Sequence, residues 1–171
     1  MPNLDEQNSQ QKVESALAHQ GLSRLENLRA DLARVAEQSG HTRFADFHFF
    51  TTSVGDDVLE LPKEDVVPVL RFLHETGRFD FLMDLTAADY PERGAKRFEV
   101  VYHLFSSKNS QRLRLKIKLA EGETVDSATP AWASANWFER EAYDMFGVVF
   151  SGHPDLRKIL THHQFVGHPL R

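Results

Sequence analysis

Two segments of alternating apolar and polar residues constrain the fold of this chain more than any other feature. Residues Arg97–Phe105 have the sequence RFEVVYHLF, and Arg112–Leu119 alternate still more strictly as RLRLKIKL. Alternation with period two places successive side chains on opposite faces of a β-strand. Because only a short loop, residues 106–110, separates the two segments, they predict an antiparallel strand pair with one face on a core.

Apolar spacing and turn residues predict the remaining elements. They are a helix over residues 23–38, a hairpin of strands over 45–53 and 58–61, a helix over 63–75, a strand over 79–85, and a helix that begins at Thr129-Pro130 and ends at Phe146. These elements predict an α+β fold of two layers, in which helices pack on a mostly antiparallel mixed sheet.

The domain organisation follows from length and local composition. A chain of 171 residues with 41% apolar content is large enough for one domain. Residues 1–21, rich in Gln, Asn, Ser and Glu, predict a flexible N-terminal tail, residues 22–147 a single α+β domain, and residues 148–171 an extended C-terminal docking segment. The chain begins without a cationic and apolar leader and has no segment long enough to span a bilayer. We therefore expect a cytoplasmic protein that contacts a membrane only through a partner.

Composition and missing motifs argue against several classes of function. The chain has no cysteine, which excludes disulfides, thiolate zinc sites and self-contained cysteine-ligated iron–sulfur clusters. A formal charge of -5 gives no general attraction for nucleic acid. Glycine-rich phosphate loops, nucleophile elbows and dinucleotide fingerprints are also absent. We expect no catalytic, cofactor-binding or metal-binding residue in this chain.

Four cations lie on one face of the strictly alternating strand: Arg112, Arg114, Lys116 and Lys118. Such a face could bind phosphate or an acidic partner. The preferred interpretation is a solvated outer face whose charges protect a sheet edge from unwanted pairing.

Four histidines near the C-terminus raise the alternative of a metalloenzyme: His153, His162, His163 and His168. Neutral imidazoles are good zinc or nickel ligands. However, the chain lacks a helical His-x-x-x-His arrangement, and two of the four histidines precede a proline that favours extended backbone. A loop role, with each ring hydrogen-bonded to backbone or carboxylate, is preferred.

The last predicted helix carries three acidic residues that resemble a general acid/base pair only superficially. Glu139 and Glu141 are two positions apart, so they face different sides of a helix. Arg140 and Asp144 are four apart, and this spacing predicts an ion pair along one side.

A short motif occurs twice after this helix. The first His-Pro motif is Gly152–Arg157 (GHPDLR), and the second is Gly167–Arg171 (GHPLR). In each copy glycine permits a turn, the His-Pro step favours extension, and leucine is followed by an arginine suited to carboxylates or carbonyls. The repeat predicts two docking elements, with two ordinary loop turns as the alternative.

Two stretches carry a resemblance to a known family. Residues Asn136–Gly147 (NWFEREAYDMFG) and Phe150–Leu160 (FSGHPDLRKIL) resemble the signature of the C subunit, of 30 kDa type, of bacterial NADH-quinone oxidoreductase, respiratory complex I. Residues Arg97–Leu104 resemble the family's central strand, so the resemblance covers about residues 79–171. Family members usually continue past the second His-Pro motif, whereas this sequence ends at Arg171.

The resemblance implies a non-catalytic peripheral-arm subunit that supports assembly and electron transfer from NADH to quinone, coupled to proton translocation. It implies that other chains of the complex bind NADH, FMN, the iron–sulfur clusters and quinone, and that this chain contacts the large D subunit and the cluster-bearing B and I subunits on the cytoplasmic side of the bacterial inner membrane. The residues that it places at or near contacts between subunits, or in the ordering of the signature helix, are Glu139, Arg140, Glu141, Tyr143, Asp144, His153, Asp155, Arg157, His168 and Arg171. A scaffold subunit of a related membrane-bound hydrogenase or NDH-type complex is the alternative.

Overall fold

The computed structural model describes residues 25–34, 47–76 and 78–171. Residues 1–44 and 45–171 form two compact units. In the first unit, residues 25–34 are helical, which confirms that part of the helix predicted over 23–38. The predicted tail over 1–21 and its boundary with the domain lie outside the described residues.

The second unit is built on a five-stranded sheet in the order β1-β2-β5-β4-β3. The strands are β1 His48–Thr51, β2 Asp57–Glu60, β3 Phe81–Asp89, β4 Phe98–Ser106 and β5 Gln111–Leu119. Three of the four pairings are antiparallel, and β2 runs parallel to β5. The predicted mostly antiparallel mixed sheet is thus confirmed.

The β4–β5 hairpin supplies the centre of the core. Its register places Tyr102 opposite Leu115 and Val100 opposite Ile117, and all four side chains are buried. Cross-strand apolar pairs of this kind stabilise a sheet and fix its register, because a slip by one residue would turn the apolar side chains to the other face. The alternation in the sequence therefore predicts both the hairpin and its core face correctly.

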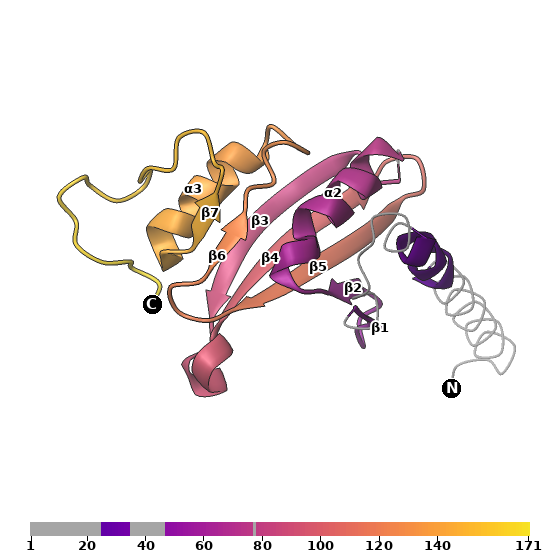
Figure 1. Cartoon of the computed structure of the whole chain (residues 1–171), viewed down its shortest axis with the longest axis horizontal. Helices are drawn as coiled ribbons and strands as arrows, with labels where there is room; N and C mark the ends of the chain where they lie inside the picture. Colours follow the sequence, from indigo (N-terminus) through magenta and orange to yellow (C-terminus); the bar gives the residue numbers. More distant parts are fainter. Residues whose placement is uncertain (1–24, 35–46, 77) are drawn as a thin grey trace, which may run out of the picture. The chain divides into compact units, whose positions relative to one another are not determined.

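Two helices complete the layer that covers the sheet. A short 3-10 turn, η2 Lys63–Asp65, leads into α2 Val66–Glu75, which buries Val66, Val69, Leu70 and Leu73. The last helix is α3 Ala135–Phe146. Figure 1 shows α2 in front of β4 and β5, with α3 to its left. Another 3-10 segment, η3 Pro91–Lys96, occupies the predicted turn between β3 and β4.

The predicted start of the last helix is wrong by five residues. The chain forms hydrogen-bonded turns after Ala128, and α3 begins only at Ala135. Thr129 does not cap the helix, because its hydroxyl pairs with that of Ser127 at 2.8 Å.

A second, parallel two-stranded sheet was not predicted. It joins β6 Thr124–Asp126 with β7 Val149–Ser151, one on each side of α3 in the sequence. Three residues are too few to show a recognisable alternation. The pairing holds residues 149–151, the beginning of the predicted C-terminal segment, against the domain.

The edge-protecting role predicted for the basic strand is also wrong. β5 lies third in the five-stranded order, because β2 adds to it in parallel. Three of its four cations instead form ion pairs: Arg114 with Asp56 at 2.9 Å, Lys116 with Glu99 at 2.7 Å and Lys118 with Glu60 at 3.0 Å. These pairs balance much of the positive charge of the strand.

Candidate partner-binding site on the signature helix and C-terminal segment

The signature helix α3 buries polar side chains that a surface helix would expose. Glu139 and Asp144 are fully buried and Arg140 is 8% exposed, whereas Glu141 lies in solvent. Buried charged groups need hydrogen-bonding partners to offset their loss of hydration. Each of the three buried groups finds those partners within the chain.

Asp144 holds the beginning of the C-terminal loop. Its Oδ2 accepts the backbone N–H groups of Ile159, Leu160 and Thr161 at 3.0, 2.8 and 2.8 Å, and its Oδ1 accepts the Thr161 hydroxyl. Burial alone would raise the pKa of Asp144, but these hydrogen bonds outweigh it and lower the pKa to about 2. The carboxylate is thus a charged anchor for a loop that follows the helix by more than a dozen residues.

The ion pair predicted between Arg140 and Asp144 is wrong. The Arg140 Nε donates to the carbonyl of Arg157 at 3.2 Å, and its guanidinium lies 4.8 Å from the centre of the Trp137 ring. Among the residues that the structure describes, no ion pair joins Arg140 to Asp144. Helical spacing permitted the pair, but the carboxylate of Asp144 accepts hydrogen bonds from loop amides instead.

Glu139 fastens the turn that precedes the helix. Its Oε1 accepts the Ala128 N–H at 2.5 Å and its Oε2 is 2.6 Å from the Ser127 hydroxyl. Burial raises the pKa of Glu139 to about 7, against the opposing effect of these two hydrogen bonds. Glu139 therefore connects the turn after β6 to the middle of α3.

The first His-Pro motif binds the beginning of α3. The Nδ1 of His153 accepts the Asp155 N–H at 2.9 Å, so the ring proton lies on Nε2, which is 3.1 Å from the carbonyl oxygen of Asn136. The ring is fully buried. This confirms the predicted loop role, in which the imidazole is hydrogen-bonded to backbone.

The second His-Pro motif binds the other end of the same helix. The Nδ1 of His168 is 3.0 Å from the carbonyl oxygen of Asp144, and the Leu170 N–H donates to that of Met145 at 3.0 Å. The Arg171 Nε donates to the carbonyl of Phe146 at 2.6 Å. The last carbonyls of a helix have no partner within it, and the second motif satisfies three of them.

Gly147 makes this contact possible. It ends α3 in the left-handed conformation, with φ at +73°. A Cβ added there would lie 2.5 Å from His168 Nε2 and 2.6 Å from Arg171 Nη2, closer than atoms can approach. Only glycine provides both the turn and the space that the second motif occupies.

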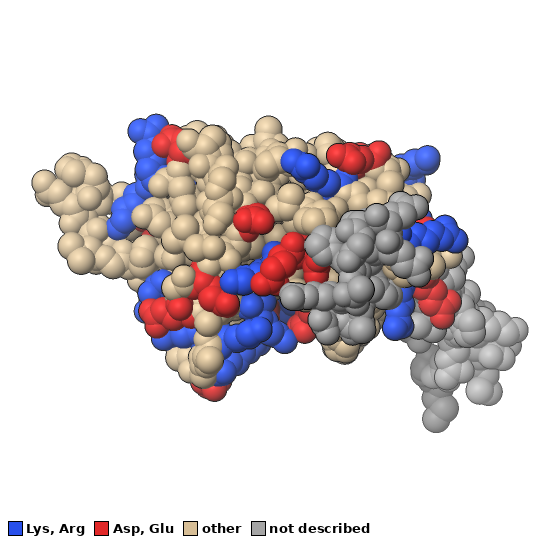
Figure 2. Space-filling model, in the orientation of Figure 1, with Lys and Arg blue, Asp and Glu red and all other residues tan. Residues whose placement is uncertain are grey.

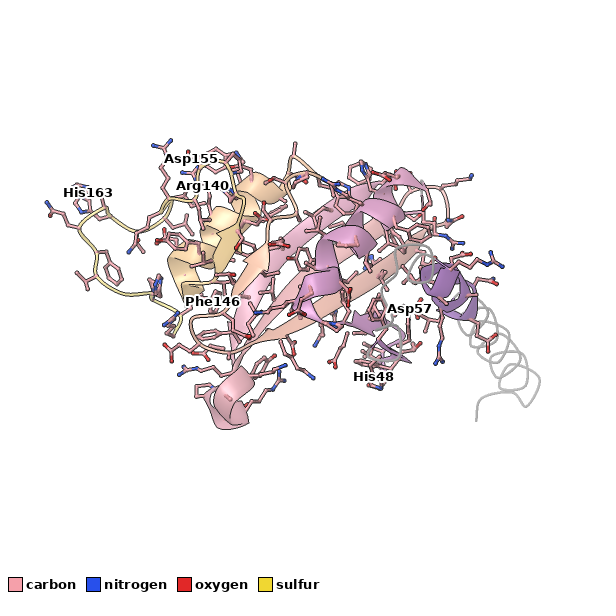
Figure 3. All side chains as sticks on the ribbon, viewed as in Figure 1. His48, Asp57, Arg140, Phe146, Asp155 and His163 are labelled. Carbon is pink, nitrogen blue, oxygen red and sulfur yellow. The ribbon has the colours of Figure 1, made fainter. Side chains whose placement is uncertain are left out.

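Between the two motifs the chain forms an arc, residues 158–166, which extends away from α3 in Figure 1. The Lys158 ammonium donates to the carbonyls of Phe165 at 2.8 Å and Gly167 at 3.2 Å and so closes the arc. His163 lies on the arc, away from Arg140 in the middle of the helix and Phe146 at its end (Figure 3).

The arc and its flanks expose large apolar side chains. Val166 is 93% exposed, Leu160 62%, Leu170 54% and Phe165 46%. No Asp, Glu, Lys or Arg occurs from Ile159 to Leu170, and Figure 2 shows this part as an uncharged projection. Contiguous exposed apolar surface marks a site of contact with another molecule.

Comparison with known proteins identifies the family. The model of the respiratory-chain NADH dehydrogenase 30 kDa subunit family matches residues 59–171. The chain belongs to this family. The resemblance found in the signature residues is thereby confirmed.

Curated members of the 30 kDa family are close in sequence. The NADH-quinone oxidoreductase C/D subunit of Bdellovibrio bacteriovorus is 59% identical over 150 residues, which are 88% of this chain and 25% of that protein. The C subunit of Cereibacter sphaeroides is 50% identical over 119 residues, 68% of this chain and 59% of that one. The C subunit of Caulobacter vibrioides is 55% identical over 108 residues, 62% of this chain and 54% of that one. The chain thus spans between a quarter and three fifths of these relatives.

The fold recurs in a solved structure of low sequence identity. A chain of the archaeal membrane-bound sulfane sulfur reductase superposes with a TM-score of 0.59 at 19% identity, covering 82% of this chain and 78% of that one. This likeness shows the shared fold.

The interface residues expected from the 30 kDa family signature divide into two groups. Glu139, Arg140, Asp144 and the His153 ring are buried within the chain. The more accessible members are Glu141, Tyr143, Asp155, Arg157, His168 and Arg171. Asp155 and Arg157 form an exposed ion pair at 2.9 Å, and Arg171 pairs with Glu121 at 2.9 Å. The sequence motifs did not point to the exposed apolar residues of the arc, although the absence of charged residues from 159 to 170 could have indicated them.

The described residues offer neither a metal cluster nor a membrane span. The rings of His162 and His163 lie 4.1 Å apart, but the described ranges contain no group of three or more potential ligands placed to hold a metal ion. No helix within those same ranges is both long and apolar enough to cross a membrane.

Proposed function

We propose that this chain is a non-catalytic peripheral subunit of an NADH:quinone oxidoreductase. It supports assembly of the complex and thereby electron transfer from NADH to quinone, coupled to proton translocation. In this proposal NADH, FMN, the iron–sulfur clusters and quinone are bound by other subunits, and the complex holds this chain at the cytoplasmic side of the bacterial inner membrane.

The observation that carries the proposal is the set of contacts that the residues of the family signature make. Its buried polar residues hold loops of the same chain, and its two His-Pro motifs attach the ends of the arc to α3. The result is an uncharged apolar projection on a fixed base. Such a surface is suited to binding a partner.

We assign the large D subunit as the partner of the arc. The Bdellovibrio bacteriovorus relative is named as a C/D subunit, and this chain covers a quarter of that protein. A single polypeptide named as both the C and the D subunit is consistent with two parts that act side by side. Contacts with the B and I subunits belong to the same proposal and rest on the family resemblance.

A tagged copy of the chain in its native host tests this function. After gentle solubilisation of membranes, we expect the tag to recover NADH-binding and cluster-bearing chains together with NADH:quinone activity. The purified chain alone should neither oxidise NADH nor contain stoichiometric zinc or nickel. Recovery with a nickel-bearing large subunit and no NADH module would favour a hydrogenase-type complex, and NADH oxidation by the isolated chain would refute the proposal.

A further inference from the structure

A cluster of polar side chains lies wholly inside the chain beneath the signature helix, separate from the apolar arc. The side chains of Glu139 and His153 are fully buried, with Glu139 Oε2 4.0 Å from His153 Nε2. Tyr102 from β4 is also fully buried, and its hydroxyl has no hydrogen-bond partner among the described residues. The buried position of these groups keeps them from direct contact with another subunit.

The hydrogen bonds of His153 fix its charge. Its Nδ1 accepts the Asp155 N–H at 2.9 Å and therefore carries no proton. The single ring proton lies on Nε2, beside the carbonyl of Asn136. In this geometry the imidazole is neutral, so it gives no countercharge to the carboxyl group of Glu139.

Among the described residues, no other cation compensates Glu139. The neighbouring titratable groups are the Tyr102 hydroxyl on β4 and Asp126, which lies next to the turn that Glu139 binds, and both are neutral or acidic. β3 contributes the apolar side chains of Leu85 and Ala87 to the core. On α3 itself, the Arg140 guanidinium lies over Trp137. Within the part of the chain that the structure describes, the only ion-pair contact within 4.0 Å of Glu139 is that with the neutral His153.

The protonated carboxyl group fits this environment. Its Oε1 accepts the Ala128 N–H, and a proton on Oε2 can be donated to the Ser127 hydroxyl at 2.6 Å. The Ser127 hydroxyl is then free to donate to Thr129 Oγ1 at 2.8 Å. An ionised Glu139 would instead accept the Ser127 hydroxyl and would be a buried charge without a countercharge.

We propose that Glu139 carries a proton in the closed form below neutral pH, and that losing this proton as the pH rises loosens the first His-Pro motif from the signature helix. The proton leaves the carboxyl group for solvent, and a buried negative charge then lies 4.0 Å from the neutral ring of His153. Opening of the first His-Pro motif admits water that hydrates this charge, and it separates His153 Nδ1 from the Asp155 N–H. Attachment of the C-terminal segment to α3 therefore depends on pH.

Linkage gives the sign and size of the effect. Burial raises the pKa of Glu139 from 4.5 to about 7 in the closed form. The closed form then binds more protons than an opened form with the ordinary value, so closure weakens as the pH rises through this window. Between pH 5.5 and pH 8.5 the opening equilibrium constant of the motif should rise about 30-fold.

The test uses the full chain in solution. With the glutamate carboxyl carbons labelled with ¹³C, NMR should show Glu139 titrating near pH 7, and a midpoint near its ordinary value would overturn the proposal. Exchange of the Asp155 amide, corrected for intrinsic base catalysis, should report the opening and its dependence on pH.

Two variants isolate the responsible group. Glu139→Gln keeps the shape of the side chain without the titration, so the pH dependence of Asp155 exchange should disappear. Glu141→Gln, which removes a carboxylate from the exposed side of the same helix, should retain it. Equal pH dependence in wild type and Glu139→Gln would refute the coupling, and if Glu139→Gln does not fold, the wild-type carboxyl titration decides.

Discussion

Replacing Asp144 with asparagine tests whether a charged anchor holds the C-terminal loop. Asparagine can keep the geometry, with its oxygen toward the N–H groups of residues 159–161 and its NH₂ toward the Thr161 hydroxyl. What it loses is the charge. Hydrogen bonds to charged groups contribute about 1 kcal/mol more than neutral ones, which gives about 4 kcal/mol over the four bonds. Because asparagine also avoids burial of a charge, we expect a net loss of about 2–3 kcal/mol.

Urea unfolding at pH 7, followed by circular dichroism, measures this loss. Glu141→Gln removes the same charge from the exposed side of α3, and its free energy of unfolding should change by less than about 0.5 kcal/mol. The folded-state pKa of Asp144 is lowered from 3.8 to about 2, so its contribution is present above the unfolded value and is lost as the pH falls toward 2. The gap between wild type and Asp144→Asn should therefore narrow in acid. Equal unfolding free energies for the two variants at pH 7 would refute the anchoring role.

Two further predictions concern Gly147 and Tyr102. Gly147→Ala strains a residue in the left-handed conformation and displaces the second His-Pro motif. The free energy of unfolding should therefore fall by about 1–3 kcal/mol, and the Leu170 amide should exchange faster. The control Gly122→Ala is also at positive φ but has open space around it, so it should leave Leu170 exchange unchanged. Tyr102→Phe removes a buried hydroxyl that has no partner within the described ranges, so the unfolding free energy should stay within about 0.5 kcal/mol of wild type or rise.

Each of these has a distinct contrary result. Unchanged Leu170 exchange in Gly147→Ala would show that the second motif is not held by its approach to the glycine. A loss of more than about 1 kcal/mol in Tyr102→Phe would show that the hydroxyl has a stabilising partner.

The sequence predicted the elements whose signals are local. Strict alternation in β4 and β5 predicted their hairpin, because a period of two and a short loop permit few other structures. The position of β5 within the sheet was not predictable in this way. It depends on parallel pairing with β2, more than fifty residues earlier in the chain, for which alternation gives no indication.

The candidate site was predicted only in part for a similar reason. The repeated His-Pro motif and the signature residues were recognisable as short patterns. The groups that these residues bind were not recognisable from the sequence. Asp144 binds loop amides and Glu139 binds the turn at Ser127, and backbone groups in loops and turns have no residue-specific sequence pattern. Helical spacing therefore suggested an ion pair between Arg140 and Asp144, whereas in the folded chain Arg140 binds a loop carbonyl and Asp144 binds loop amides.

The most direct test of the central claim places a charge on the apolar arc and measures assembly. Val166→Asp alters a side chain that is 93% exposed, so the chain itself should remain folded. Val54→Asp, at a position 82% exposed in the β1–β2 turn, is the matched control. In a host that lacks the native gene, Val166→Asp should reduce both the recovery of partner chains and the membrane NADH:quinone activity, while Val54→Asp restores both. Full assembly and activity with Val166→Asp would contradict the claim that the arc is the partner-binding surface.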